Sequence, residues 1–220
     1  MNLIIVGGPG AGKGSLANCL IKDLGIPHVS SGDICRENIN LKTPLGHQIE
    51  GYLKSGGLVP DAVISDVIFK RLAQPDCKRG FLLDGFPRTL HQAEMLKQKY
   101  NIDFIVRIET TTETVIGRLC GRYMCRNCGT IHNKLWHPIT KCRECGGELY
   151  QREDDTEAVI RNRLEKYHAE EKPIIDFYEK EAKAKSKNAP KILTISSDIK
   201  ETAEVVYDKF KKQYGTILGL

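Results

Sequence analysis

The stretch Gly7-Gly8-Pro9-Gly10-Ala11-Gly12-Lys13-Gly14-Ser15 decides how the rest of this 220-residue chain is interpreted. It follows an apolar run at residues 3–6 and precedes a helix-like pattern at residues 15–24. A glycine-rich turn between a strand and a helix can bind phosphate, because its N–H groups turn inward and the helix offers its N-terminus. Lys13 stands where a Walker A loop has its lysine, although the hydroxyl of Ser15 comes one residue late. The stretch therefore predicts a site for nucleotide phosphates.

The composition fits an ordinary globular protein, with 40% hydrophobic and 28% charged residues. The length allows one large domain, or one domain with small insertions. The sequence has no apolar run near the roughly 20 residues that span a bilayer, and its start lacks the pattern of a secretory signal. We therefore expect a cytoplasmic protein without a membrane partner.

The formal charge of +5 is compatible with nucleic acid, anionic lipid or a phosphate-rich small ligand. The positive residues form no tail or block, and several arginines stand beside glycines and carboxylates instead. Because the planar arginine fork binds phosphate oxygens in pairs, this distribution favours phosphate binding.

Strand-like and helix-like segments alternate along the chain. The expected strands lie at residues 3–6, 28–30, 81–84, 104–108 and 191–195, and the main helices at 15–24, 89–100, 112–119, 156–185 and 201–214. This order predicts an α/β fold with a five-stranded parallel sheet flanked by helices, whose ligands bind at the carboxyl ends of the strands. Pro173 is expected to kink or divide the long helical segment.

Two segments interrupt the alternation. Residues 31–60 contain short helical pieces that we expect to break at Pro44, Gly51 and the Gly56-Gly57 pair. Residues 122–155 are rich in cysteine, glycine and turn residues. Neither segment can build a large core alone, so both are predicted to be insertions carried by the sheet.

Eight cysteines in a chain without a secretion signal favour thiols or metal ligands over disulfides. Four are scattered and are interpreted as buried or incidental. The other four form two C-x2-C pairs separated by thirteen residues, which is zinc-site spacing: Cys125, Cys128, Cys142 and Cys145. Four thiolates leave no ligand position for water, so the predicted zinc is structural. Two disulfides are the alternative, which a cytosolic protein disfavours.

Asp84 ends a predicted buried strand and precedes the turn at residues 85–89. A carboxylate at the carboxyl end of a strand, facing the phosphate loop, can hold Mg²⁺ through water molecules. The alternative is a turn cap, because aspartate before glycine is also ordinary turn chemistry.

Five motifs in register resemble the adenylate kinase family in its long-lid form, over nearly the whole chain. They are residues 7–15, Ser31-Gly32-Asp33 with Arg36, Asp84-Gly85-Phe86-Pro87-Arg88 with Gln92, Gly121-Arg122, and Arg152-Glu153-Asp154-Asp155 with Arg163. The late hydroxyl of the loop agrees with the family, which has a threonine where this chain has Ser15. The resemblance implies a P-loop nucleoside monophosphate kinase fold with an AMP-binding helical insertion and a zinc-binding lid.

The same resemblance implies reversible, Mg²⁺-dependent transfer of a phosphoryl group from ATP to AMP, giving two ADP. It places the core in residues 1–29, 60–121 and 156–220, the AMP-binding insertion in 30–59 and the lid in 122–155. The expected partners are ATP and AMP, with Mg²⁺ and structural Zn²⁺ as cofactors. We expect a monomer that does not bind nucleic acid.

Residue roles carry over from the family at matching positions. The ATP-binding residues are Gly10, Ala11, Gly12, Lys13, Gly14, Ser15, Arg118 and Arg122. The AMP-binding residues are Ser31, Arg36, Gly57, Val59, Gly85, Arg88, Gln92, Arg152 and Arg163, with Gln92 at the adenine edge. The catalytic residues are Lys13, Asp84, Arg88, Arg122, Arg152 and Arg163.

The chain departs from the family pattern near the donor base. The interval between the cysteine pairs is short, Ile131 stands where an aromatic residue is expected, and the loop at residues 196–198 has lost its glycine. His132 and Trp136 are candidates either to stack on the donor adenine or to pack within the lid.

Two alternatives stay open. The amide of Gln92 could serve another base, so a kinase with a different acceptor is possible. The second alternative is that residues 125–145 form a zinc ribbon that binds nucleic acid, although this segment lacks interleaved basic and aromatic residues.

Overall fold

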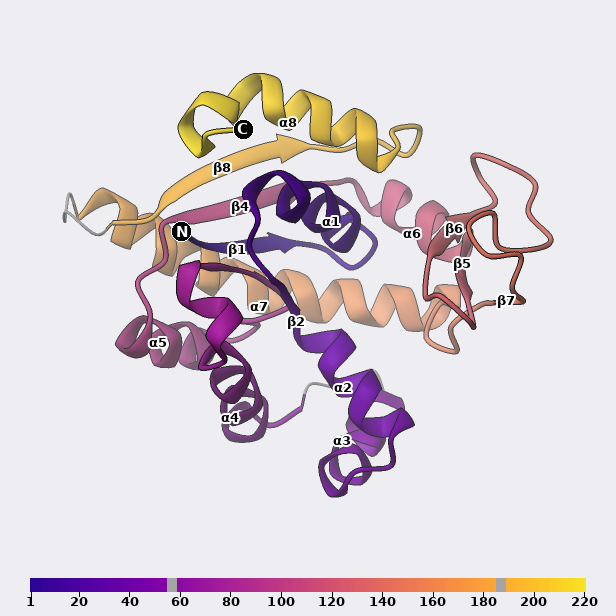
Figure 1. The fold of residues 1–220 in the computed structure, drawn as a ribbon, viewed down its shortest axis with the longest axis horizontal. Helices are drawn as coiled ribbons and strands as arrows, with labels where there is room; N and C mark the ends of the chain where they lie inside the picture. Colours follow the sequence, from indigo (N-terminus) through magenta and orange to yellow (C-terminus); the bar gives the residue numbers. More distant parts are fainter. Residues whose placement is uncertain (55–58, 185–188) are drawn as a thin grey trace.

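The computed structural model describes residues 1–54, 59–184 and 189–220, and it is built on a five-stranded parallel sheet (Figure 1). The strands are β1 (Asn2–Gly7), β2 (His28–Ser30), β3 (Phe81–Asp84), β4 (Phe104–Glu109) and β8 (Lys191–Ser196). Their order across the sheet is β2-β3-β1-β4-β8. This confirms the predicted fold class, and it places the ends of β1, β2 and β3 beside one another.

Strand β1 is central and buried on both faces. Leu3 and Ile5 contribute to one apolar cluster, which includes residues of α1 (Lys13–Leu24) and α8 (Ala203–Leu218). Ile4 and Val6 contribute to a cluster on the opposite face. Successive side chains of a strand point to opposite faces, so an unbroken apolar run is what a strand between two helical layers requires.

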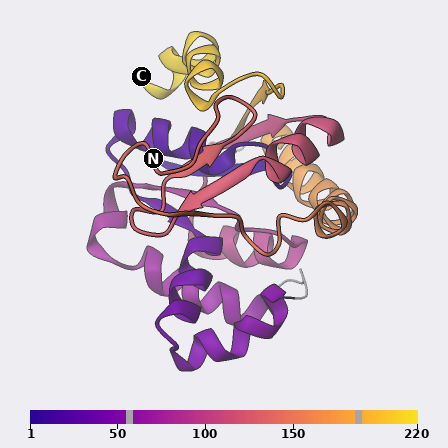
Figure 2. The same ribbon diagram turned by 90° about the vertical axis from the view of Figure 1, so that its right-hand side faces the viewer.

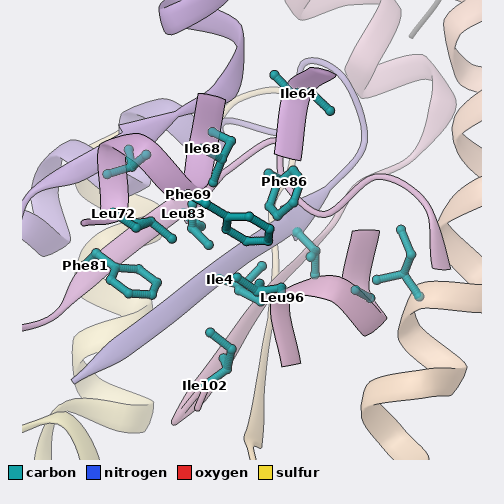
Figure 3. Close-up of a cluster of buried hydrophobic side chains, with 14 of the residues drawn as sticks. Ile4, Ile64, Ile68, Phe69, Leu72, Phe81, Leu83, Phe86, Leu96 and Ile102 are labelled. Atoms are coloured by element: carbon teal, nitrogen blue, oxygen red, sulfur yellow. The ribbon is translucent and has the colours of Figure 1, made fainter. Parts of the chain in front are cut away.

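The second cluster includes residues of α4 (Asp61–Leu72), α5 (Leu90–Lys99) and α7 (Glu157–Lys183). Figure 3 shows Ile68 and Phe69 of α4 and Leu96 of α5 gathered around Ile4. These two packed layers hold the sheet, and with it the strand ends, in place.

Pro173 was expected to kink the long helical segment or to divide it, and α7 runs through Pro173 without a division, so the second of these alternatives is wrong. Both halves of the helix are held by packing. Ile160 and Leu164 pack with α6 (Thr112–Cys120), and Ile174 and Ile175 pack in the core below the sheet. This packing offsets the missing N–H and the ring clash of an internal proline.

The first insertion contains α2 (Ser31–Asn40) and α3 (Pro44–Lys54), followed by α4 and a short 3-10 helix η1 (Pro75–Arg79). Pro44 opens α3, which is the position where a helix accepts proline best. Gly51 was expected to break the helix but lies within it. An internal glycine costs only about 1 kcal/mol relative to alanine, which the burial of Ile49 in the core can offset.

The second insertion carries its own antiparallel sheet of order β6-β5-β7, which the sequence did not predict. Its strands are β5 (Arg122–Cys125), β6 (Ile131–Asn133) and β7 (Leu149–Tyr150). They are too short to show an apolar alternation. Figures 1 and 2 place this sheet and the α2–α3 pair on the side toward which the strands of the main sheet point.

No helix in the described part of the chain is long and apolar enough to cross a membrane.

Candidate active site

The glycine-rich loop joins β1 to α1 at the predicted place. Gly7, Gly10 and Gly12 all have positive φ, at 151°, 75° and 93°. A Cβ on Gly10 would also lie 2.8 Å from the side chain of Leu119. Both the backbone conformation and the close packing therefore require glycine here. Ser15 lies in the first turn of α1, where N–H groups lack helical partners and can bind an anion.

Lys13 is the first residue of α1 and folds back over the loop. Its Nζ donates to the carbonyl oxygens of Gly7 at 2.7 Å and Gly8 at 2.9 Å. The ammonium group is therefore positioned at the loop that the sequence assigned to phosphate.

Asp84, at the end of β3, lies next to this loop. Its Oδ2 would be 3.5 Å from a Cβ on Gly14, and it lies 3.4 Å from Nε2 of His28. Burial acts to raise the pKa of Asp84, but the contact with His28 and the charge of Lys13 hold it below its usual value. The carboxylate therefore stays ionised at neutral pH, as a group that binds Mg²⁺ or its water ligands must.

Gly85 brings two predicted acceptor-site residues together. Its carbonyl oxygen accepts from Ser31 Oγ at 2.6 Å and from Arg88 Nε at 2.8 Å. Its φ is 76°, and a Cβ would lie 2.6 Å from Ser31 Oγ. On the neighbouring α2, Arg36 pairs with Asp33. The ends of β2 and β3 thus meet as the parallel register requires.

Gln92 lies in the first turn of α5 and is only 2% exposed. Its Nε2 donates to Asp61 at 2.6 Å, and its Oε1 accepts from the backbone N–H of Arg88 at 2.7 Å. Val59 is buried in the same core cluster as Ile64 and Ile68 of α4. Gly57, the remaining predicted acceptor-site residue, lies outside the described residues.

Arginine side chains from four parts of the chain interact electrostatically at the same end of the sheet. Burial and the positive charges of Arg122 and Arg36 lower the pKa of Arg152 to about 10. Burial and these same two charges also lower the pKa of Arg163, and Arg163 and Arg36 in turn act on Arg88. We call Arg36, Arg88, Arg122, Arg152 and Arg163 the arginine cluster. Guanidinium groups this close together form a strong binding field for a polyanion.

Two carboxylates orient part of the cluster. Asp155 is buried and accepts both arms of Arg122, with Nε to Oδ2 at 2.8 Å and a terminal nitrogen to Oδ1 at 2.5 Å. Asp154 accepts from Arg163 at 2.7 Å. The motif at residues 152–155 therefore contributes Arg152 to the cluster, and its two aspartates hold Arg122 and Arg163 in position.

Arg118 lies apart from the cluster, buried at 7% exposure. It donates to Ala11 O of the phosphate loop at 3.3 Å, and also to Ser197 Oγ at 2.9 Å, Glu201 O at 3.0 Å and Asp198 O. It ties the phosphate loop to the loop after β8, which contains residues 196–198.

The two donor-base candidates in the lid lie in different places. His132 Nε2 lies 3.3 Å from Cys142 Sγ, against the cysteines. Trp136 Nε1 donates to Ile199 O at 3.2 Å, and nearby Asn133 Nδ2 donates to Arg118 O at 2.8 Å. Trp136 is thus the candidate that lies near Arg118 and the loop after β8.

The four paired cysteines converge, with all sulfur atoms within 4.8 Å of one another. Cys125 and Cys145 lie 3.4 Å apart, Cys128 and Cys142 3.6 Å, and Cys128 and Cys145 3.4 Å. A tetrahedral zinc site with Zn–S bonds of about 2.3 Å has sulfur–sulfur edges of about 3.8 Å, so the arrangement fits. All four are free thiols rather than disulfides.

The turns around the cysteines also suit a metal site. Gly129 and Gly146 have φ of 71° and 72° and close each C-x2-C turn, donating to Cys125 O at 3.1 Å and Cys142 O at 2.9 Å. The hydroxyl and backbone N–H of Thr130 lower the pKa of Cys128 to about 6. These contacts favour the thiolate form that binds metal.

The sequence did not single out Asp61, His28 or Glu201, and it noted Ser197 only as part of the loop at residues 196–198, although each contacts a predicted site residue. Only Asp61 had a local signal, because an acidic residue after Pro60 is typical of a helix start. The other contacts join residues far apart in the chain, so no local pattern could have revealed them.

A phosphate loop after the central strand, an acidic strand end beside it and a cluster of arginines define a P-loop phosphotransferase. A sequence model of the adenylate kinase family matches residues 5–183. Adenylate kinases of known sequence agree. That of Caldicellulosiruptor bescii is 47% identical over 186 residues, covering 81% of this chain and 86% of the relative. The chain belongs to the adenylate kinase family, the ATP:AMP phosphotransferases.

The match extends to relatives that cover more of the chain. The adenylate kinase of a Geobacillus species is 42% identical over 210 residues, or 91% of this chain and 97% of the relative. That of Thermosipho melanesiensis is 42% identical over 214 residues, or 94% of this chain and 99% of the relative. The predicted family is therefore confirmed over both insertions.

Because its pKa in the folded state is lowered, charged Arg152 destabilises the protein at neutral pH. We predict that Arg152→Met raises the melting temperature by a few degrees and weakens inorganic tripolyphosphate binding by at least about tenfold. Thermal denaturation and calorimetric titration measure the two effects. Arg161→Met, which removes an exposed partner of Glu157, is the control and should change neither. A lower melting temperature for Arg152→Met would contradict the prediction.

Proposed function

We propose that this chain transfers the terminal phosphoryl group of ATP to AMP, reversibly and with Mg²⁺, to give two ADP. The observation that carries the proposal is that Asp84 interacts with both Lys13 of the phosphate loop and Arg88, which belongs to the arginine cluster and also to the site formed with Ser31 and Gly85. A site for a single nucleotide needs one phosphate-binding group of residues. Two such groups, with guanidinium groups close to both, suit a donor and an acceptor nucleotide whose phosphates meet.

The proposed donor site is the phosphate loop with its neighbours. The N–H groups of the loop, including those of Gly10, Ala11, Gly12, Gly14 and Ser15, would surround the donor phosphates. Lys13 would exchange the carbonyl oxygens of Gly7 and Gly8 for phosphate oxygens. Arg122 would bind the transferring group, while Arg118 would hold the loop in place beneath the donor base.

The proposed acceptor site lies between the ends of β2 and β3 and the helices α2 and α5. Arg36 and Arg88 would bind the monophosphate, and Arg152 and Arg163 would bridge toward the transferring group. Gln92 would pair with the base beside Ser31, Val59 and Gly85, with Gly57 completing the site from outside the described residues.

Phosphoryl transfer needs little covalent help from a protein. It needs two substrates in line, exclusion of water and neutralisation of the charge that spreads over the moving group. The arginine cluster supplies that charge, and Asp84 would hold Mg²⁺ through its water ligands. We propose that residues 30–59 and 122–155 close over the core formed by residues 1–29, 60–121 and 156–220, which would exclude water.

We propose that the metal in the lid is zinc, with a structural role. The sulfur–sulfur distances and the four thiol ligands fit a closed tetrahedral site. Such a site would tie together a small sheet that has little core of its own. The free cysteines suit a reducing compartment, so we also propose a cytoplasmic location. We propose that the protein acts as a monomer, because the site is assembled within one chain.

The acceptor is tested by measuring ADP formation from ATP with AMP, GMP, CMP or UMP in turn. We predict kcat/KM to be highest for AMP by at least about a hundredfold, because a buried amide that pairs with one base rejects others strongly. Equal rates with all four monophosphates would overturn the AMP assignment.

Removing the loop ammonium tests the donor site. We predict that Lys13→Met lowers kcat by about two orders of magnitude or more, because its charge acts on the transferring group as the transition state forms. Lys70→Met, which removes an exposed partner of Asp66 on α4, should leave kcat within about twofold of the parent. A raised KM with unchanged kcat would mean that Lys13 only binds.

Metal removal tests the lid. We predict one zinc per chain by elemental analysis, lost in Cys142→Ser but kept in Cys19→Ser. Loss of zinc should lower the melting temperature far more than the initial rate at moderate temperature, because the metal holds structure only. Immediate loss of turnover in a protein that is still folded would contradict this role.

A further inference from the structure

Asp61 connects the proposed acceptor site to the helix that supports it. It is the first residue of α4, and it accepts hydrogen bonds from two side chains at the start of α5. Its Oδ1 accepts from Gln92 Nε2 at 2.6 Å, and its Oδ2 accepts from Thr89 Oγ1 at 2.8 Å. Both carboxylate oxygens are therefore directed at the segment that carries the base-pairing candidate.

The other end of the Gln92 amide is held as firmly. Its Oε1 accepts from the backbone N–H of Arg88 at 2.7 Å. Turning the amide by half a turn would place Oε1 against the Asp61 carboxylate and Nε2 against the Arg88 N–H. Both contacts would be repulsive, and at 2% exposure water cannot relieve them. Asp61 and Arg88 together define a single orientation of the amide.

A fixed amide has a defined pattern of hydrogen bonding. Nε2 has a second hydrogen and Oε1 has a second lone pair, so a donor and an acceptor remain side by side. A 6-aminopurine offers the matching edge, with an acceptor at N1 and a donor at N6. A 6-oxopurine offers the reverse, with a donor at N1–H and an acceptor at O6, and would meet the amide donor to donor.

We propose that Asp61 is a positioning residue that makes the acceptor site select a 6-aminopurine over a 6-oxopurine, by fixing the orientation of Gln92. The inference rests on the proposed function. It explains why the Gln92 amide, which could form hydrogen bonds with several bases, would select one base here. Asp61 touches no reacting atom and acts only through the Gln92 side chain.

A merely structural role for Asp61 must be separated from this one. An acidic residue at a helix start stabilises the helix, so its removal lowers stability under either view. Loss of structure would lower activity toward every acceptor alike. Only loss of amide orientation would change the ratio between two acceptors that differ at this edge.

The experiment compares AMP with inosine 5′-monophosphate, which replaces the 6-amino group by an oxo group and otherwise keeps the purine unsubstituted at C2. The measured quantity is the kcat/KM for AMP divided by that for inosine monophosphate. We expect Asp61→Ala to lower this ratio by about tenfold, the effect of one buried hydrogen bond. Asp66→Ala, which removes an exposed carboxylate from the same helix, should leave the ratio within about twofold.

A double-mutant cycle shows whether Asp61 acts through Gln92. Gln92→Leu should lower the ratio by itself, and adding Asp61→Ala to it should change the ratio by less than about twofold. A further tenfold loss in the double variant would overturn the inference. If Asp61→Ala does not fold, Asp61→Glu keeps the charge at the helix start and moves the acceptor oxygen by one methylene, and it should also lower the ratio.

The outcomes separate the inference from the proposed function. A parent protein that does not prefer AMP to inosine monophosphate would remove the AMP assignment itself. A parent that prefers AMP, with the same ratio in Asp61→Ala, would overturn the inference and leave the proposed function intact. Equal losses toward both acceptors would assign Asp61 a structural role only.

Discussion

The repulsion among guanidinium groups at one end of the sheet is the constraint on which the rest of this structure depends. Arg152 is held where burial and the charges of Arg122 and Arg36 lower its pKa to about 10, which an isolated surface arginine would not show. Such a cluster persists only if packing elsewhere pays its electrostatic cost. The two apolar clusters on either face of the sheet supply that stability, and Asp154 and Asp155 supply local countercharge.

Phosphate groups would relieve the same repulsion, so the features that destabilise the free protein are those that would bind two nucleotides. The surrounding elements divide this task. The glycine loop follows β1 and Asp84 ends β3 of the main sheet, whereas Arg36 stands on the first insertion and Arg122 begins the lid. Binding that joins these arginines through shared phosphates would therefore favour closure of both insertions, because a ligand shifts a population only through contacts that differ between states.

Specificity has a different physical origin from charge neutralisation. An arginine binds any phosphate, but the Gln92 amide distinguishes bases only while its orientation is fixed. Asp61 and the Arg88 N–H fix it from opposite ends. The lid shows the same principle in its cysteines, since a tetrahedral thiolate site depends on turns that Gly129 and Gly146 allow. In both places, contacts between polar groups define a conformation that apolar packing alone would leave open.

The sequence by itself determined the sheet, the phosphate loop and the two cysteine pairs, because each follows from local periodicity or fixed spacing, and five motifs in register carried the resemblance to the family. The loop could be recognised from Gly7 to Ser15 since strand, turn and helix are adjacent in the chain. Only the tertiary structure decided that α7 continues through Pro173, that Arg118 binds the loop after β8, and that Asp61 holds Gln92. These features rest on contacts between residues far apart in the chain, whose geometry and burial are set only when the layers pack.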